Sequence, residues 1–471
     1  MNTNNTNKLS FGVKSGYGMG MLGECLAMNT FYIYFLFYLT DAVGLDPGVA
    51  GVITMVAVFW GAFTDLFAGV KTDGSKNPKG RRRPFILKAA VPLGIAIFLM
   101  YTDFSAIGDE MKFVYFLVVT MFFWLALSFT DIPYLSLGSE ITDDYAERSS
   151  VRSYANVLNY AGMILASSGT LTLVSMLSGD AGVGDTGAWS KVGALFGVLV
   201  LIAYWISAAV TKGRDSLPLP AQESGAPKQN YGKTCIEVLK IKPFRYILLY
   251  TVFAYGGVIL WTCSYIYYLY YNMYFDDAQA ALLMFIYCFM VMGVSAVLGI
   301  IKVEKRTIVI ALTALLGVGM CIGHFTGLNT AGIYIMFFLF ALAISAYFVQ
   351  IYSMVYDVCD VDEFVHGGGR DGVIVSLFYF VGKVIGGVAM AAMGWILSLA
   401  QYDAELWEQS AYTQAGISVS TLLIPGILML IGSVVIIKYP INAKNFGALR
   451  KAIEDRAAGK EYSTEAFEEL L

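Results

Sequence analysis

Charged residues are scarce in this 471-residue sequence: Asp, Glu, Lys and Arg make up 14% of it, whereas hydrophobic residues make up 57%. A soluble protein of this size could not cover its surface with so few charges. The composition therefore excludes an ordinary soluble domain. Long apolar runs separated by short polar segments instead predict an all-α polytopic membrane protein embedded in a lipid bilayer.

Cysteine and histidine are scarce as well. The six cysteines are scattered without a C-x-x-C pair, which predicts neither a disulfide framework nor a zinc site. The two histidines, His324 and His366, have no metal-ligand partner at helical spacing. A phosphate-binding glycine loop and an activated nucleophile are missing too. We therefore expect no enzyme, no metal site and no bound cofactor.

About twelve apolar segments are long enough to span a bilayer, which takes about 20 residues each. They lie at 16–40, 48–70, 85–103, 112–138, 151–178, 188–211, 243–272, 279–301, 306–326, 330–355, 372–400 and 414–438. A polar, proline-bearing segment between the sixth and the seventh is typical of a linker. The sequence thus predicts an N-terminal six-helix bundle (1–211), a cytoplasmic linker (212–242), a C-terminal six-helix bundle (243–438) and a cytoplasmic tail (439–471).

The distribution of basic residues predicts the orientation. With both termini in the cytoplasm, the inner segments carry 28 of the 31 Lys and Arg residues, and only Lys112 and Lys191 lie outside. The opposite orientation would leave two basic residues inside, against the rule that cytoplasmic loops carry the positive charge. We expect a multi-pass protein of the cell (inner or plasma) membrane.

The segment from Phe63 to Phe85 carries a specific charge pattern, D-x3-G-x3-D-x6-G-R-R-R. Asp65, Gly69 and Asp73 lie on one helical face, and Lys79 and Arg81–Arg83 follow. Basic clusters alone often do no more than fix orientation. The full spacing, however, resembles the loop after the second helix of major facilitator superfamily transporters, which predicts a membrane carrier.

Four ionisable residues fall inside predicted spans: Glu24, Asp65, Asp131 and Lys383. A charge inside a membrane is costly, so each of them is a functional candidate. Pro133 removes a backbone donor beside Asp131, and glycines beside Lys383 allow close helix packing. Asp131 and Lys383 could instead form a structural ion pair between the two halves. Both roles are compatible, because a carrier needs contacts between its halves that break and re-form.

With these residues placed, the chain resembles the glycoside–pentoside–hexuronide:cation symporter family, of which the melibiose carrier is the best-known type. The resemblance covers nearly the whole chain and is carried by Gly16–Gly20 (GYGMG), Tyr38–Gly51 (YLTDAVGLDPGVAG), the Asp65–Phe85 loop, Asp131–Tyr134 (DIPY), Glu147–Arg148, Asp357–Phe364 (DVCDVDEF), Arg370 and Lys383. It implies a major facilitator fold of two six-helix bundles, alternating access, and a sugar site near the midplane.

The resemblance also implies substrate residues. Asp131 matches the fourth-helix carboxylate that holds sugar hydroxyls, and Lys383 matches the eleventh-helix lysine near that site. Glu24 lies beside the positions of the first-helix acid, which are Met21 and Cys25 here, and Asn156 stands where relatives carry an arginine. Tyr134, in the same motif as Asp131, completes the predicted set.

The implied cation site is incomplete. Asp65 matches one of two second-helix carboxylates, Gly61 replaces the other, and Thr64 and Ser128 stand at the neutral oxygen ligands. Glu24 could restore a second charge. A lone carboxylate suits a proton carrier better than a sodium ligand. We expect coupling to H+, or a weak dependence on Na+, and not tight sodium coupling.

Charge networks in the predicted cytoplasmic loops are expected to hold one conformation closed. The residues are Asp73, Arg81, Arg82, Arg83, Glu147, Arg148, Asp357, Asp360, Glu363 and Arg370. The segments 141–162 and 357–383 look alike, each with a carboxylate-rich turn, an arginine and a helix start, which indicates related halves or a coincidence between two polar turns.

The sequence thus predicts a secondary active symporter of a glycoside, pentoside or hexuronide. Two alternatives stay open: a carrier of the same fold for a non-sugar amphiphile such as a lysolipid, and a channel or sensor without coupled transport. The expected partners are a small-molecule sugar and the bilayer. We expect a monomer without a nucleic-acid partner.

Overall fold

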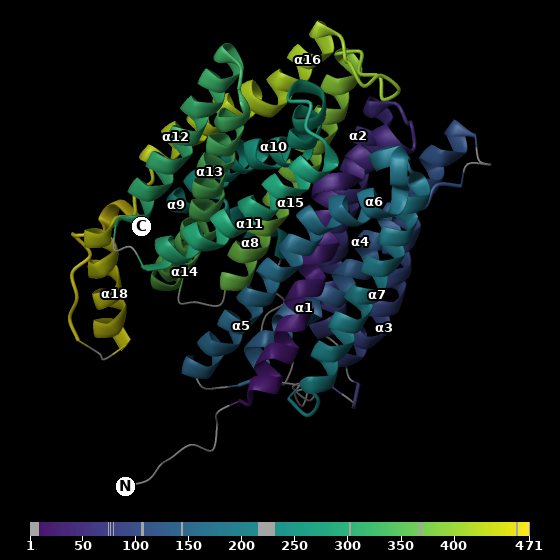
Figure 1. Cartoon of the computed structure of the whole chain (residues 1–471). Coiled ribbons are helices and arrows are strands. Elements are labelled where there is room, and N and C mark those ends of the chain that lie inside the picture. The colour runs from purple at the N-terminus through teal and green to yellow at the C-terminus, as the bar shows by residue number, and fades with distance from the viewer. Residues whose placement is uncertain are drawn as a thin grey trace. The chain divides into compact units, whose positions relative to one another are not determined.

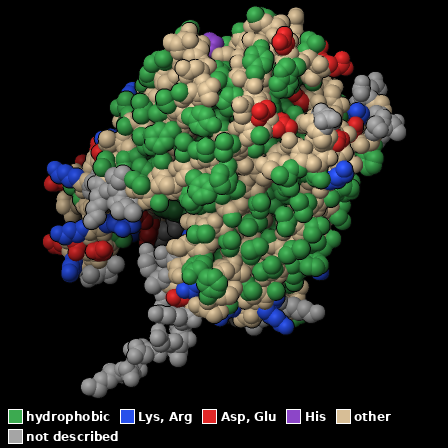
Figure 2. All heavy atoms as spheres, in the orientation of Figure 1, with side chains coloured by type: hydrophobic (Ala, Val, Ile, Leu, Met, Phe, Trp, Pro, Cys, Tyr) green, Lys and Arg blue, Asp and Glu red, His purple; other side chains and the backbone are tan. Residues whose placement is uncertain are grey.

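The computed structural model describes residues 9–73, 75, 77–78, 80–104, 108–142, 145–214, 231–300, 303–366, 370–457 and 460–470. Its secondary structure is helical, and no strand occurs within these ranges. Hydrophobic side chains cover much of the surface seen in Figure 2. An all-helical chain with an apolar outer surface agrees with the predicted membrane protein, because a helix satisfies its own backbone hydrogen bonds in lipid.

The helices of the first half, in chain order, are α1 (Phe11–Thr30), α2 (Pro47–Asp73), α3 (Arg83–Met100), α4 (Asp109–Glu140), α5 (Tyr145–Ile164), α6 (Thr170–Ser178) and α7 (Thr186–Val210). Those of the second half are α8 (Tyr231–Val238), α9 (Lys242–Tyr250), α10 (Gly256–Tyr267), α11 (Asp277–Ile300), α12 (Lys305–Thr326), α13 (Thr330–Ala346), α14 (Tyr352–His366), α15 (Asp371–Leu399), α16 (Ala411–Ser418), α17 (Ile424–Ile437) and α18 (Ala443–Ala457).

Single π-helical turns continue or join several of these helices into longer rods. Examples are η1 (Phe31–Phe35) and η2 (Tyr38–Ala42) after α1, η3 (Leu165–Gly169) between α5 and α6, and η6 (Tyr268–Asn272) after α10. Such turns occur frequently at functional sites. The first helical rod therefore runs from Phe11 to Ala42, as the predicted first span requires.

Eleven helices among the described residues are long and apolar enough to cross a membrane. They match the second to twelfth predicted spans, and the predicted first span is the α1 rod. One boundary was wrong: the tenth span does not end at 355, because the helix continues through α14 to His366. The carboxylates from Asp357 to Glu363 therefore lie on a helix and not in a turn.

The chain forms two compact units that do not coincide with its two halves. The first contains residues 1–224, 262–288 and 390–417, and the second contains 225–261, 289–389 and 418–471. In the first unit, α1 packs against α5 and α7, and α3 packs against α4 and α7 (Figure 1). Gly94 and Gly197 bring α3 and α7 so close that an added Cβ on Gly197 would clash with the carbonyl oxygen of Gly94.

Candidate functional site

Three residues predicted as cation ligands meet between α2 and α4. The hydroxyls of Thr64 and Ser128 are 2.8 Å apart, and Ser128 Oγ donates to Asp65 Oδ1 at 2.6 Å. The same two hydroxyls contact the carbonyl oxygens of Gly61 and Trp124, at 3.0 and 2.9 Å. The result is a compact group of hard oxygen atoms around one carboxylate. Such a group can bind a proton or a small hard cation.

Gly61 is part of the packing beside this group. A Cβ added to Gly61 would lie 2.6 Å from the ring of Trp124, which is fully buried. The indole thus fills the space that a second carboxylate on α2 would need. The replacement of the second acid by Gly61 is therefore matched by a bulky neighbour, and Asp65 supplies the carboxylate of the group.

The two predicted acids, Glu24 and Asp131, lie near the same two tyrosines of the first unit. Both carboxylates are within electrostatic reach of the hydroxyls of Tyr17 and Tyr204, which lie on α1 and α7. Asp131 lies three residues after Ser128 on α4, so the two side chains are neighbours, with Cβ atoms roughly 5–6 Å apart. The predicted substrate acid and the oxygen group at Asp65 therefore adjoin each other.

Tyr134 is a packing residue in the structure. Its ring is fully buried and stacks on Tyr17 at a centroid distance of 4.8 Å. Its hydroxyl donates to the backbone oxygen of Tyr17 at 3.1 Å. It fixes α4 against α1 next to Asp131, and its predicted contact with substrate stays a prediction.

Two exposed polar side chains lie one turn apart on α5. Asn156 is one of them, and Arg152 lies one turn earlier on the same exposed face. Arg152 also acts electrostatically on Tyr17. The predicted substrate set omitted Arg152, although it stands four residues before Asn156, the position at which the sequence lacks the expected arginine. A polar exposed face within a membrane span is typical of a water-accessible pathway.

Lys383 lies in the second unit, on α15, and its side chain is half-buried. The neighbouring Gly382 faces the ring of Tyr255, to which an added Cβ would be 3.7 Å away. Its predicted roles, as a substrate contact or as the ion-pair partner of Asp131, stay predictions.

The predicted network after α2 is described only in part. The side chains of Asp73 and Arg148 lie outside the described residues, so their predicted contacts are not established. Arg83 Nε donates to the backbone oxygen of Ala208 at 2.6 Å, which ties the start of α3 to the end of α7. Arg82 is buried, and Arg81 is half-buried.

Glu147 has a partner that sequence reasoning missed. Its carboxylate forms an ion pair with Lys14 at 3.0 Å and accepts from the backbone nitrogen of Leu9 at 2.9 Å. The pair fixes the beginning of α1 to the beginning of α5. The only signal in the sequence was the pair of opposite charges at two helix starts.

Arg370 pairs with Asp362, which lies on α14 between the predicted network residues Asp360 and Glu363. Arg370 donates two hydrogen bonds to Asp362, at 2.9 and 2.5 Å, and one to Glu237 on α8 at 3.0 Å. The Asp362 side chain is fully buried, whereas Glu363 points outward. The hydrogen bonds that Arg370 donates to Asp362 raise the pKa of Arg370 above its ordinary value.

The other two acids of α14 have separate partners. Asp357 pairs with Lys305 at 2.7 Å, and Asp360 pairs with Arg450 of α18 at 3.1 Å. Arg456 of the same helix donates to the backbone oxygen of Phe364 at 2.8 Å. The predicted tail thus includes a helix that docks on the end of α14.

A polar cluster that sequence reasoning missed closes the end of the first unit where the α1 rod finishes. Asp41 Oδ1 accepts hydrogen bonds from Tyr271 and Tyr402, each at 2.5 Å, and Thr40 Oγ1 is 2.7 Å from the hydroxyl of Tyr267. Burial, with the nearby Asp41, raises the pKa of Tyr402 well above its ordinary value. Tyr402 therefore stays a donor at neutral pH. The cluster joins residues of the two sequence halves.

The fold and these charged groups define a multi-pass membrane carrier of the major facilitator type. The chain belongs to the family described as MFS/sugar transport protein, whose model matches residues 16–443. This assignment makes it a transporter and not an enzyme.

Relatives along the whole chain carry symporter names. The "Putative glycoside/cation symporter YagG" of Escherichia coli (strain K12) is 27% identical, over 94% of this chain and 95% of that protein. The "Inner membrane symporter YicJ" of the same organism is 26% identical, over 98% of this chain and 97% of that protein. A crystal structure of a D-xylose–proton symporter shares the fold, with a TM-score of 0.64 and 12% identity over 91% of this chain and 97% of that one.

Proposed function

We propose that the chain is a cation-coupled symporter of a glycoside, pentoside or hexuronide that works by alternating access. The observation that carries the proposal is the position of Asp131 one helical turn from Ser128, which is itself hydrogen-bonded to Asp65. In a coupled carrier, binding of the cation must change the affinity for substrate, and binding of substrate must change the affinity for the cation. A shared turn of α4 supplies such a connection.

The residues predicted to bind substrate favour a polyhydroxylated solute. Carboxylates hold sugar hydroxyls by charge-assisted hydrogen bonds, and here Glu24, Asp131 and the amide of Asn156 lie on three helices of one unit. The names of relatives point the same way: a glycoside for one, and sulfoquinovose for a relative 25% identical over 98% of this chain. Lys383 stays a proposed contribution of the second unit.

We propose that transport is coupled to H+, or depends only weakly on Na+. The group around Asp65 has one carboxylate and two hydroxyls, and Trp124 occupies the space of a second acid. One carboxylate can carry one proton, whereas tight sodium binding usually needs several oxygen ligands with more negative charge. We also propose both termini in the cytoplasm, from the distribution of Lys and Arg.

The test is a binding screen of the purified protein against glycosides, pentoses and hexuronides, read by thermal shift and by uptake into proteoliposomes. Asp131→Asn should weaken binding of the best solute by roughly ten- to hundredfold, which corresponds to the loss of about 1.5–3 kcal/mol from a hydrogen bond to a charged group. Tyr412→Phe, at an exposed position, is the control. Normal binding by Asp131→Asn would contradict the site, and binding of no sugar would contradict the substrate class.

A further inference from the structure

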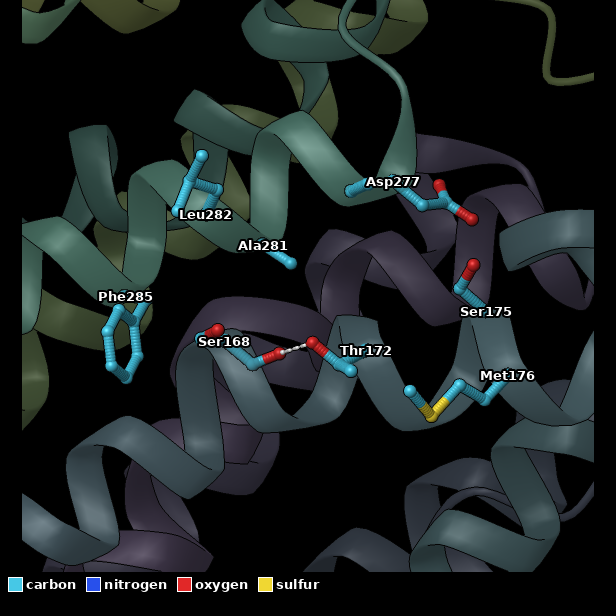
Figure 3. A pocket seen from close by; sticks show the side chains of 9 residues that line it. Ser168, Thr172, Ser175, Met176, Asp277, Ala281, Leu282 and Phe285 are labelled. Carbon is cyan, nitrogen blue, oxygen red and sulfur yellow. Dashed lines mark hydrogen bonds between the residues drawn. The ribbon is translucent and has the colours of Figure 1, made fainter.

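A cleft that the transport proposal does not use lies in the first unit, between α6 with the preceding η3 turn and α11. It has a volume of about 350 Å3. Figure 3 shows Ser175 and Asp277 at one end and Phe285 at the other. All of its lining residues belong to the first unit. None of them is a candidate substrate, cation or network residue.

One wall of the cleft is a stripe of hydroxyls. Ser168, Thr172 and Ser175 recur at helical spacing and extend roughly 10 Å along the axis, at 1.5 Å per residue. Thr172 Oγ1 donates to the backbone oxygen of Ser168 at 2.9 Å. The Oγ atoms of Ser168 and Ser175 have no hydrogen-bond partner among the described residues, so both can bind a ligand.

The polar end of the cleft carries a carboxylate without a cation. Asp277, the first residue of α11, accepts a hydrogen bond from Tyr270 at 2.9 Å. Within the described part of the chain, no Lys or Arg pairs with it. One carboxylate oxygen therefore remains for a ligand, and a positively charged group suits it.

The rim of the cleft is apolar and open. Met176 is 75% exposed, Leu282 is 54% exposed and Phe285 is 44% exposed. These residues lie on membrane-spanning helices, so in a bilayer they contact acyl chains. The polar end lies where α6 finishes and α11 begins, which is head-group depth on the side predicted to face outward.

We propose that this cleft binds the head group of a phospholipid with a primary ammonium, such as phosphatidylethanolamine, with an acyl chain along Leu282 and Phe285. The ammonium donates to Asp277, and phosphate and glycerol oxygens accept from Ser168 and Ser175. The volume lies near the lower end of the roughly 300–1,000 Å3 range of ligand pockets. It fits a head group and leaves the chains in the bilayer.

The negative charge of Asp277 favours a phospholipid with a primary ammonium over the other lipid classes. An anionic head group would set its phosphate beside Asp277 without a basic residue to balance it. A quaternary choline has no N–H to donate to the carboxylate. A free sugar would gain nothing from the exposed apolar rim, so the rim distinguishes this site from a second solute site.

Native mass spectrometry of the full chain tests the proposal. The purified protein is mixed with equal amounts of phosphatidylethanolamine, phosphatidylcholine and phosphatidylglycerol of identical acyl chains. We expect preferential retention of phosphatidylethanolamine. Asp277→Asn should lower its affinity by about tenfold, the loss of one charge-assisted contact. Phosphatidylglycerol binding should strengthen, because the negative charge beside its phosphate is gone, and asparagine still accepts from Tyr270.

Asp276→Asn is the matched control. Asp276 is the adjacent exposed acid, it caps the start of α11 through Gln279 and does not line the cleft, and asparagine caps equally well. Ala278→Trp should block the cleft from its edge and remove the preference without changing any charge. Equal retention of the three lipids, or an unchanged preference in Asp277→Asn and Ala278→Trp, would overturn the proposal. Equally tight binding of water-soluble glycerophosphoethanolamine would overturn the lipid assignment.

Discussion

At the scale of single residues, the hydroxyl chain from Thr64 through Ser128 to Asp65 is the feature that links chemistry to transport. Ser128 has one hydrogen to donate, and the shortest of its contacts is to Asp65. Thr64 then completes the chain by donating to Ser128. A change in the charge of Asp65 must reorganise these hydroxyls, and Asp131 lies one turn farther along the same helix as Ser128.

Gly61→Asp should not convert the protein to sodium dependence. Its Cβ would meet the buried indole of Trp124 at 2.6 Å, so the helix or the ring must move. We expect a destabilisation of about 1–3 kcal/mol, as for overpacking in a core, measured by thermal unfolding. Gly69→Asp is the control, because an added Cβ there meets its nearest atom at 3.9 Å. A fully stable Gly61→Asp protein with sodium-stimulated uptake would contradict this view of Gly61.

Residue types at a motif could be predicted from the sequence, but helix phase and distant partners could not. Thr64, Asp65 and Ser128 were predicted together and do meet. The choice between Asp362 and Glu363 depends on which face of α14 is buried, and the sequence places carboxylates on both faces. The bond from Lys14 to Glu147 joins residues 133 positions apart, and no local pattern encodes such a pairing.

At the scale of elements, charge pairs fix helix ends at both ends of the spans. Arg370 ties the start of α15 to the last turns of α14 and to α8 in the predicted linker. Such a contact can act as a latch, because its loss shifts a conformational equilibrium without touching the substrate.

Arg370→Gln should destabilise the conformation described here by up to about 3–5 kcal/mol, because it removes the arginine partner of the fully buried Asp362 and leaves the ring nitrogen of His366, 3.1 Å away, as its basic neighbour. The readout is transport rate, with substrate affinity measured alongside, and Asp362→Asn in the same protein should restore much of the loss. Arg450→Gln removes the far more exposed pair to Asp360 and should cost about 0–1 kcal/mol. Unchanged transport in Arg370→Gln would count against the latch.

Tyr271→Phe combined with Tyr402→Phe should loosen the opposite end. Each change removes a hydrogen bond to Asp41, worth about 1.5–3 kcal/mol when the acceptor is charged. The native thiol of Cys288 reports the opening, because it is buried and lies 3.1 Å from Ser167 Oγ. We expect its labelling by a small water-soluble thiol reagent to accelerate by roughly tenfold or more, with Cys288→Ser as the blank. An unchanged labelling rate would mean that the hydrogen bonds to Asp41 do not keep this end of the first unit closed.

At the scale of the whole molecule, hydropathy and the charge pattern were sufficient to predict the fold. The spans follow from the length of apolar runs, and the carrier class follows from motifs spread along the chain. The division into two compact units could not be predicted, because it depends on contacts of 262–288 and 390–417 with the first half. Those contacts include the Asp41 cluster, whose tyrosines look like ordinary interfacial aromatics in the sequence.

The most direct test of the account is solute uptake into proteoliposomes under an imposed proton gradient or an imposed sodium gradient, using the best sugar from the binding screen. Proton coupling through Asp65 predicts strong stimulation by an acidic exterior, little by sodium, and loss of gradient-driven uptake in Asp65→Asn with exchange of solute retained. Strong stimulation by sodium without any response to a pH gradient would contradict it, and would mean that the oxygen group at Asp65 is a sodium site despite its single carboxylate.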